Sequence, residues 1–300
     1  MNRIIEEYAK LNNIIFGVCD AHDLEGMGEE ILNIPFFNGD FRDRVSPQAS
    51  LTGAKSIIVL GVEVNKKSIF EGLDCVVAAS MSGMDYHKRL RTIAQNLVDL
   101  MLKQAEFNYK IQIDSGPLAE RALAVKAGLG FSGKNQCVIS HKFGSFFNIA
   151  LIIVDIGLDY TMQMGKLTCE KCDTCMISCP ASALGHNGNF DYTKCISYLT
   201  QKKGALTDYE AALIGTSIYG CDICQNVCPH NARHAVRSPK EVTAKTLNRI
   251  LKMDNTQFEE CFKDSHFFWR GQATINRNCL IAIDNLDLCS SKNNEKYGKG

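Results

Sequence analysis

The sequence has no excess of either charge, because 33 lysine and arginine residues face 33 aspartate and glutamate residues. A contact with nucleic acid must therefore come from a local basic patch. Long apolar runs are also missing: the most apolar stretch, residues 146–154, contains Asn148 and is too short to span a bilayer. The charged N-terminal segment lacks the apolar core and cleavage site of a signal peptide. We therefore expect a cytoplasmic protein without a membrane anchor.

The pattern of apolar residues divides the 300 residues into three consecutive segments. We expect an α/β (α+β) domain over residues 1–160, a cysteine-rich domain over 161–239, and a small helical segment over 240–300. The polar tail of the last segment is expected to be disordered. The predicted elements of the first domain are helices over 1–12, 85–107 and 117–127, and strands over 14–19, 56–64, 109–114, 136–140 and 146–155.

Cysteine is abundant, with fourteen residues, and eight of them are clustered. Residues 169–180 have the bacterial ferredoxin spacing, in which three cysteines grip one cluster and the fourth, before proline, ligates the other. The second run, residues 221–229, lacks its first cysteine because position 218 is isoleucine. Cys195, which lies between the runs, is the natural substitute. We therefore predict that residues 161–239 form a ferredoxin-like double [4Fe–4S] domain. One cluster is predicted on Cys169, Cys172, Cys175 and Cys228, and the other on Cys179, Cys195, Cys221 and Cys224.

Eight cysteines are also compatible with two zinc sites, but the x3-Cys-Pro ending of both runs favours iron–sulfur clusters. The scattered cysteines are interpreted as buried structural thiols. They are Cys19, Cys75, Cys137, Cys261, Cys279 and Cys289.

A glycine pattern, Gly128-x-Gly130-x-x-Gly133, spells a dinucleotide-binding fingerprint. Such a fingerprint must follow a strand and open a helix, whereas this one follows a predicted helix and precedes a predicted strand. The pattern therefore favours a glycine-rich helix stop, and Lys134 and Asn135 after it are candidates for ligand contacts.

Asp114 and His87 are the candidate acid–base residues. Asp114 ends a predicted strand, and ligands of open α/β sheets bind at the carboxyl ends of strands. A partly shielded carboxyl there can donate a proton. The pattern alone favours the alternative, an aspartate that stabilises a turn. His87, in the first turn of the long helix, is either a proton shuttle or an ordinary surface residue.

Five segments of the chain together resemble one family. They are residues 85–88 (DYHK), 114–135 (DSGPLAERALAVKAGLGFSGKN), 143–147 (FGSFF), 195–200 (CISYLT) and 219–231 (YGCDICQNVCPHN). In this order they resemble the epoxyqueuosine reductases, which modify tRNA, in a short form without a C-terminal HEAT-like extension. One departure is His230, which stands where the family commonly has tryptophan.

The resemblance implies an oxidoreductase that reduces epoxyqueuosine to queuosine at the wobble position of tRNA. It implies base-off cobalamin in the N-terminal domain, reduced through the two clusters, and Asp114 as the proton donor. By the same resemblance, the residues expected to contact cobalamin are Asp114, Asn135, Val138, Ile149 and Thr200. We also expect a monomer that receives electrons from a ferredoxin- or flavodoxin-type protein.

A tRNA substrate needs basic residues on the enzyme. The predicted contacts are Lys202, Lys203, Arg233 and Arg237, while the basic residues of 240–252 fit a solvated helix face equally well. Two other functions remain open at this point. One is a cobalamin and iron–sulfur reductase of a small molecule, such as a reductive dehalogenase. The other is a non-catalytic electron carrier or corrinoid activator.

Overall fold

The computed structural model of the chain describes residues 1–26, 36, 39–64, 76–81, 83–161, 168–185, 189–234 and 243–297, with side chains up to residue 286. The chain forms two compact units, each assembled from separate stretches of sequence. The sheet unit comprises Met1–Val64, Tyr86–Thr174 and Cys228–His234. The helical unit comprises Asn65–Asp85, Cys175–Val227 and Ala235–Gly300.

A four-stranded antiparallel sheet forms the centre of the sheet unit. Its order is β1 (Ile15–Asp20), β2 (Ser56–Glu63), β6 (Phe147–Val154) and β3 (Tyr109–Gln112). The two central strands, β2 and β6, are almost continuously apolar and buried. This pattern requires both faces of the sheet to be covered.

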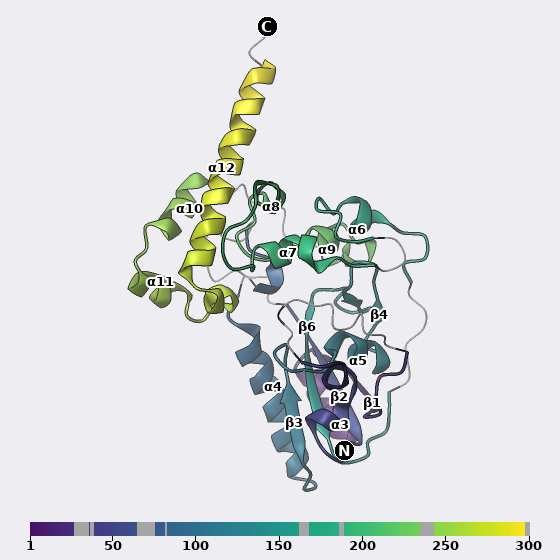
Figure 1. The fold of residues 1–300 in the computed structure, drawn as a ribbon. Helices are drawn as coiled ribbons and strands as arrows, with labels where there is room; N and C mark the ends of the chain where they lie inside the picture. The colour runs from purple at the N-terminus through teal and green to yellow at the C-terminus, as the bar shows by residue number, and fades with distance from the viewer. Residues whose placement is uncertain are drawn as a thin grey trace. The chain divides into compact units, whose positions relative to one another are not determined.

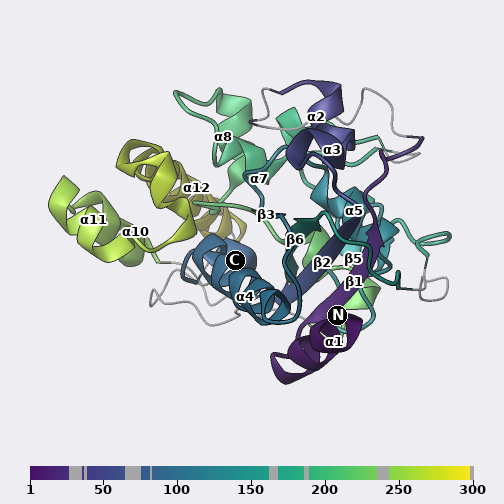
Figure 2. The same ribbon diagram turned by 90° about the horizontal axis from the view of Figure 1, so that it is seen from below.

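Helices supply the cover on the two faces of the sheet (Figure 2). One face carries α1 (Asn2–Leu11) and α4 (Tyr86–Leu102), whose apolar residues repeat with helical spacing and are fully buried at Leu90 and Leu97. The other face carries α2 (Phe41–Val45), α3 (Pro47–Ser50) and α5 (Glu120–Lys126).

The helical unit has its main core around the C-terminal helices α10 (Ala244–Leu251), α11 (Asn255–Phe262) and α12 (Gln272–Tyr297) (Figure 1). Tyr219 is fully buried in this core, and its backbone forms an isolated parallel β-bridge with Val77. The cysteine-rich region adds four short helices, α6 (Thr174–Ile177), α7 (Ile196–Leu199), α8 (Asp208–Ile214) and α9 (Ile223–Asn226). Among the helices that the structure describes, none has the length and apolar character needed to cross a membrane.

The expected mixture of helices and strands is confirmed, but the units do not follow the three consecutive segments predicted. Residues 228–234 return to the sheet unit, and the C-terminal helices share one core with the cysteine-rich region. Helix α12 also runs to Tyr297, through most of the tail that was expected to be disordered. That tail holds no proline or glycine before Gly298, so nothing in it terminates a helix.

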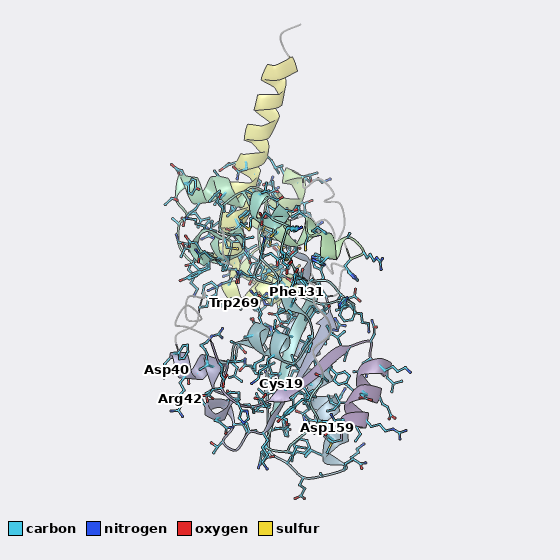
Figure 3. All side chains as sticks on the ribbon, turned by 90° about the vertical axis from the view of Figure 1, so that its right-hand side faces the viewer. Cys19, Asp40, Arg42, Phe131, Asp159 and Trp269 are labelled. Atoms are coloured by element: carbon cyan, nitrogen blue, oxygen red, sulfur yellow. The ribbon has the colours of Figure 1, made fainter. Side chains whose placement is uncertain are left out.

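Two scattered cysteines match the expectation of buried thiols. Cys19, labelled in Figure 3, and Cys279 are buried, and burial raises the pKa of each thiol to about 12. Cys137 is half-buried, whereas Cys261 is exposed because it lies on the outer face of α11. Cys75 and the side chain of Cys289 lie outside the described residues.

Close packing between β1 and the end of α5 predicts a stability effect at Gly17. A Cβ atom there would overlap the carbonyl oxygen of Ala127 and a methyl group of Leu129, and the backbone carbonyl cannot move away cheaply. We expect Gly17→Ala to lower the free energy of unfolding by about 1–3 kcal/mol. Anaerobic urea denaturation followed by circular dichroism measures this change.

Gly157→Ala is the matched control, because a Cβ atom at Gly157 meets nothing within 4 Å. A Gly17→Ala protein as stable as this control would contradict the packing argument.

Candidate functional site

Asp114 stands on a strained turn directly beyond the end of β3. Its φ angle is +53°, and the amide of Ser115 donates to the carbonyl of Ile113 at 2.5 Å, which closes a three-residue γ-turn. Left-handed backbone at a residue other than glycine costs about 1–3 kcal/mol and concentrates at functional sites. The side chain of Asp114 is 63% exposed, so the turn presents the carboxyl outward.

The structure brings His87 to this carboxyl. His87 Nε2 lies 3.5 Å from Asp114 Oδ2, and the imidazole stacks on the ring of Tyr86 with 4.3 Å between centroids. Asp114 and His87 are 27 positions apart, and sequence analysis treated them as separate candidates. Because β3 pairs antiparallel with β6, Asp114 does not lie at the carboxyl edge of an open parallel sheet, as the sequence had predicted.

A second carboxyl, which sequence analysis missed, lies under the turn. Glu120, the first residue of α5, accepts the backbone N–H of Asp114 at 2.7 Å and the side-chain amide of Gln112 at 3.2 Å. Burial, together with the negative charge of Asp114, raises the pKa of Glu120 to about 7. The only sequence signal was the position of Glu120, six residues after Asp114 at the start of a predicted helix.

The glycine-rich segment is a helix stop followed by a hairpin. Gly128 has φ +79°, and its amide and that of Leu129 bond back to the carbonyls of Val125 and Ala124. This is the Schellman arrangement that ends helices. The short strands β4 (Phe131–Ser132) and β5 (Val138–Ile139) follow. The placement supports the helix-stop interpretation and not dinucleotide binding, which needs a strand before the glycines and a helix after them.

Asn135, in this hairpin, carries an orphaned donor. Its side chain is only 6% exposed; Oδ1 accepts the amide of Cys137, and Nδ2 has no hydrogen-bond partner among the described residues. A buried donor without a partner costs about 1–3 kcal/mol, so it indicates a missing ligand or water. The predicted pocket residues Val138 and Ile149 pack in one apolar cluster on the α5 face of the sheet.

Thr200, the remaining predicted cobalamin contact, belongs to the helical unit. It is completely buried, and its hydroxyl donates to the carbonyl of Ser197 while accepting the amide of Gly220. Its hydroxyl thus connects the CISYLT segment to the second cysteine run. A cobalamin contact by Thr200 stays a prediction.

Three predicted ligands of the first cluster gather in the sheet unit. Burial raises the pKa of the Cys228 thiol, and the negative charges of Cys169 and Cys172 raise it further, which indicates that the three sulfurs are close neighbours. Cys175, the fourth predicted ligand, follows Cys172 by three residues. Lys134 Nζ lies 2.7 Å from Asp173 Oδ1, and the thiolates of Cys169 and Cys172 help to raise the pKa of this ammonium group after Asp173 itself.

The predicted ligands of the second cluster lie in the helical unit. Burial raises the pKa of the Cys221 thiol to about 12, and the charges of Cys195 and Cys179 contribute in the same direction. Asp222 Oδ2 accepts the amide of Ala79 at 2.6 Å and holds this cysteine loop in place. Cys195, chosen by counting ligands, therefore lies beside two of its predicted partners.

Asn231 fastens the segment of Cys228 to the sheet unit. Its Oδ1 accepts the amide of Ser145 and its Nδ2 donates to the hydroxyl of the same residue, both at 2.8 Å. Neighbouring His230 packs edge-on against Phe131, with 5.2 Å between the ring centroids. Asn231, in segment 219–231, and Ser145, in segment 143–147, thus hold these two segments together.

The predicted tRNA contacts differ in how much of their charge is available. Lys203 and Arg233 are exposed. Lys202 forms an ion pair with Glu210 at 2.6 Å, so its charge is already compensated within the helical unit. Arg237 lies outside the described residues.

Comparison with known families agrees with this organisation. A family described as "4Fe-4S double cluster binding domain" matches residues 168–231, the range that holds all eight predicted ligands. A second family, described as "Epoxyqueuosine reductase QueG, DUF1730", matches residues 44–115. The fold and the cluster segment therefore define an oxidoreductase with a mixed α and β unit and a double iron–sulfur cluster domain.

The chain belongs to the epoxyqueuosine reductase family. It is 34% identical to the epoxyqueuosine reductase of Bacillus subtilis over 92% of this chain and 77% of that protein. It is 33% identical to the enzyme of Bacillus anthracis over 85% of this chain and 70% of that protein.

Solved structures give the same result. The epoxyqueuosine reductase of Streptococcus thermophilus superposes with a TM-score of 0.85 at 30% identity, over 95% of this chain and 81% of that one. An epoxyqueuosine reductase bound to an epoxyqueuosine-modified stem loop of tyrosine tRNA has a TM-score of 0.84 at 28% identity, over 95% and 80% of the two chains.

The ion pair between Lys134 and Asp173 predicts an effect on one cluster. Because the ammonium group lies near Cys169 and Cys172, it favours the additional negative charge of the reduced cluster. We expect Lys134→Gln to lower the midpoint potential of that cluster, on the order of tens of millivolts. A redox titration followed by electron paramagnetic resonance measures the potential.

The control is Lys110→Gln, which removes one charge from an exposed position on β3. Equal potentials in the two variants would show that Lys134 does not act on the cluster.

Proposed function

We propose that this chain reduces epoxyqueuosine to queuosine at the wobble position of tRNA, with Asp114 as the proton donor. The observation that carries this proposal is the exposed carboxyl of Asp114 on its strained turn beside His87, in a unit that also bears predicted cluster ligands. Family membership supports the choice of substrate, and one relative was solved with an epoxyqueuosine-modified tRNA stem loop.

Eight thiolates are the proposed ligands of the two [4Fe–4S] clusters. Cys228, whose pKa is raised by burial and by the charges of Cys169 and Cys172, is assigned to the first cluster together with these two residues and Cys175. The second cluster is assigned to four residues of the helical unit, Cys179, Cys195, Cys221 and Cys224. Thiolates suit iron because they are soft and anionic, and the match to a double-cluster family supports this assignment.

Residues of the sheet unit fit a bound cobalamin. Asn135 contributes a buried amide donor with no partner in the described part of the chain, and Val138 and Ile149 contribute apolar side chains from the cluster on the α5 face of the sheet. A large cofactor with amide side chains can accept a hydrogen bond from Asn135 Nδ2 and can pack against the apolar side chains. Cobalamin, when bound, supplies the reduced metal centre that delivers electrons to the epoxide.

The chain itself supplies the proton. Reducing an epoxide to an alkene takes two electrons and two protons and releases the oxygen as water, so an acid must stand beside that oxygen. Asp114 fills this role from the exposed turn, and His87, 3.5 Å away, orients the carboxyl and returns a proton to it. A relative from Bacillus subtilis, solved with its catalytic loop swung out of the active site, suggests that this turn moves during turnover.

Other components follow from the same proposal. The stem loop of the tRNA contacts exposed Lys203 and Arg233, with Arg237 and Lys202 as further contacts. A ferredoxin- or flavodoxin-type protein supplies electrons to the clusters. We place the enzyme, as a monomer, in the cytoplasm.

The direct test uses Asp114→Asn, which keeps the size of the side chain and removes the transferable proton. We expect the reconstituted wild-type protein, with reductant and cobalamin, to convert epoxyqueuosine in tRNA to queuosine. The variant should retain its clusters and cobalamin but lose at least about a hundredfold in turnover. Mass spectrometry of nucleosides from digested tRNA measures the product.

Asp159→Asn is the control, because it removes one exposed carboxyl of the same unit, away from the turn. Wild-type protein with intact clusters that makes no queuosine would contradict the proposed function. Full activity in the Asp114 variant would remove this residue from the mechanism.

Cys195 provides a separate test of the ligand assignment. We expect Cys195→Ser to perturb the second cluster alone, so that the protein loses up to about half of its iron and sulfide. Iron and sulfide analysis, together with electron paramagnetic resonance, distinguishes this result from loss of both clusters. Cys279→Ser is the control, since it changes a buried thiol outside the predicted ligand set. Iron content and an electron paramagnetic resonance spectrum that are both identical to those of the wild-type protein would contradict the assignment of Cys195 as a ligand.

A further inference from the structure

The turn at Asp114 needs a restraint, because its backbone conformation is unfavourable by itself. The residue has φ +53° and is exposed, so packing of its own side chain does not hold it there. A strained turn persists only where its surroundings determine it. The neighbouring hydrogen bonds show what supplies the restraint.

One oxygen of Glu120 makes the central contact. Oε1 accepts both the backbone N–H of Asp114 at 2.7 Å and the side-chain amide of Gln112 at 3.2 Å. Gln112 in turn brackets Leu118, donating to its carbonyl at 3.0 Å and accepting its amide at 3.1 Å. Both ends of the segment from Ile113 to Leu118 are thereby tied to two side chains.

We propose that Glu120 is the positioning residue for Asp114: its carboxylate holds the turn in the conformation that presents the catalytic carboxyl. This inference rests on the proposed role of Asp114 and adds a second functional residue to it. Glu120 acts through the backbone of Asp114 and does not itself reach the substrate.

The charged groups around Glu120 are consistent with this role. On α5, the neighbouring charge is Arg121, which donates to the carbonyl of Gln136 at 2.8 Å. From α2, Arg44 donates to the carbonyl of Pro117 at 2.8 Å and so supports the same segment. Asp114 donates its backbone N–H to Glu120, and its carboxyl lies 3.5 Å from His87 Nε2.

Because Oε1 accepts both hydrogen bonds, glutamine is an informative substitution. Glu120→Gln retains a carbonyl oxygen for both donors and removes only the charge. Glu120→Ala removes the acceptor. Glu120→Asp keeps the charge and the acid at the start of α5 but withdraws the oxygen by about one C–C bond, roughly 1.5 Å. The three variants therefore separate the hydrogen bond from the charge.

Hydrogen–deuterium exchange of the peptide over residues 113–118 tests the restraint without reference to activity. We expect exchange to be roughly tenfold or more faster in Glu120→Ala and Glu120→Asp than in the wild-type protein. Glu120→Gln should stay within about threefold of the wild-type rate. If the alanine variant fails to fold, the aspartate variant decides the result.

Asp155→Ala is the matched control. Asp155 accepts the backbone N–H of Asn108 at 2.8 Å, before the start of β3, so it makes the same kind of bond at the opposite end of the strand. We expect its loss to speed exchange around residue 108 and to leave 113–118 unchanged.

Turnover of epoxyqueuosine in tRNA provides the second readout. We expect Glu120→Ala to lower kcat by about tenfold to a hundredfold with little change in KM for tRNA, and Glu120→Gln to restore most of kcat. Unchanged exchange in both the alanine and aspartate variants overturns the proposal, as does a glutamine variant with normal exchange and no activity. If even the wild-type protein makes no queuosine, the proposed function fails, whereas the exchange data still decide the role of Glu120.

Discussion

Two reciprocal hydrogen bonds between Asn231 and Ser145 hold the segment that contains Cys228 within the sheet unit. They fix residues 228–234 beside β6, although the rest of the second cysteine run belongs to the helical unit. Cys228 is thereby held close to Cys169 and Cys172, which are more than fifty residues earlier in the chain. The proposed ligand set of the first cluster depends on this fastening, because it includes Cys228.

The same unit places three groups around one strained turn. His87 comes from the first turn of α4, Asp114 from the end of β3 and Glu120 from the first turn of α5. The helices that carry His87 and Glu120 pack on opposite faces of the sheet, so the turn lies where the two layers meet. A carboxyl that is exposed yet held by its backbone suits an acid that must reach a bulky substrate.

Much of this arrangement was predictable from residue patterns. Strands β1, β2 and β6 and helix α1 appear where apolar patterning predicted them, because short apolar runs and helical spacing are local features of the sequence. The missing ligand at position 218 led to Cys195 by counting alone. The antiparallel order of the sheet was not predictable in this way, since pairing depends on contacts distant in sequence. The role of Glu120 was also hidden, because a glutamate at a helix start is ordinary until its acceptor oxygen is seen against the amide of Asp114.

The sequence by itself determined the chemistry that the chain carries: eight clustered thiols, a helix stop at Gly128 and an aspartate followed by Ser-Gly-Pro. These features follow from residue type and short-range spacing. Only the tertiary structure decided which of them act together. It grouped Cys228 with the first cysteine run, brought His87 to Asp114, and left the amide of Asn135 buried without a partner. The physical reason is that cofactor binding and proton transfer require contacts within a few ångströms, and such contacts are made by packing between elements that are far apart along the chain.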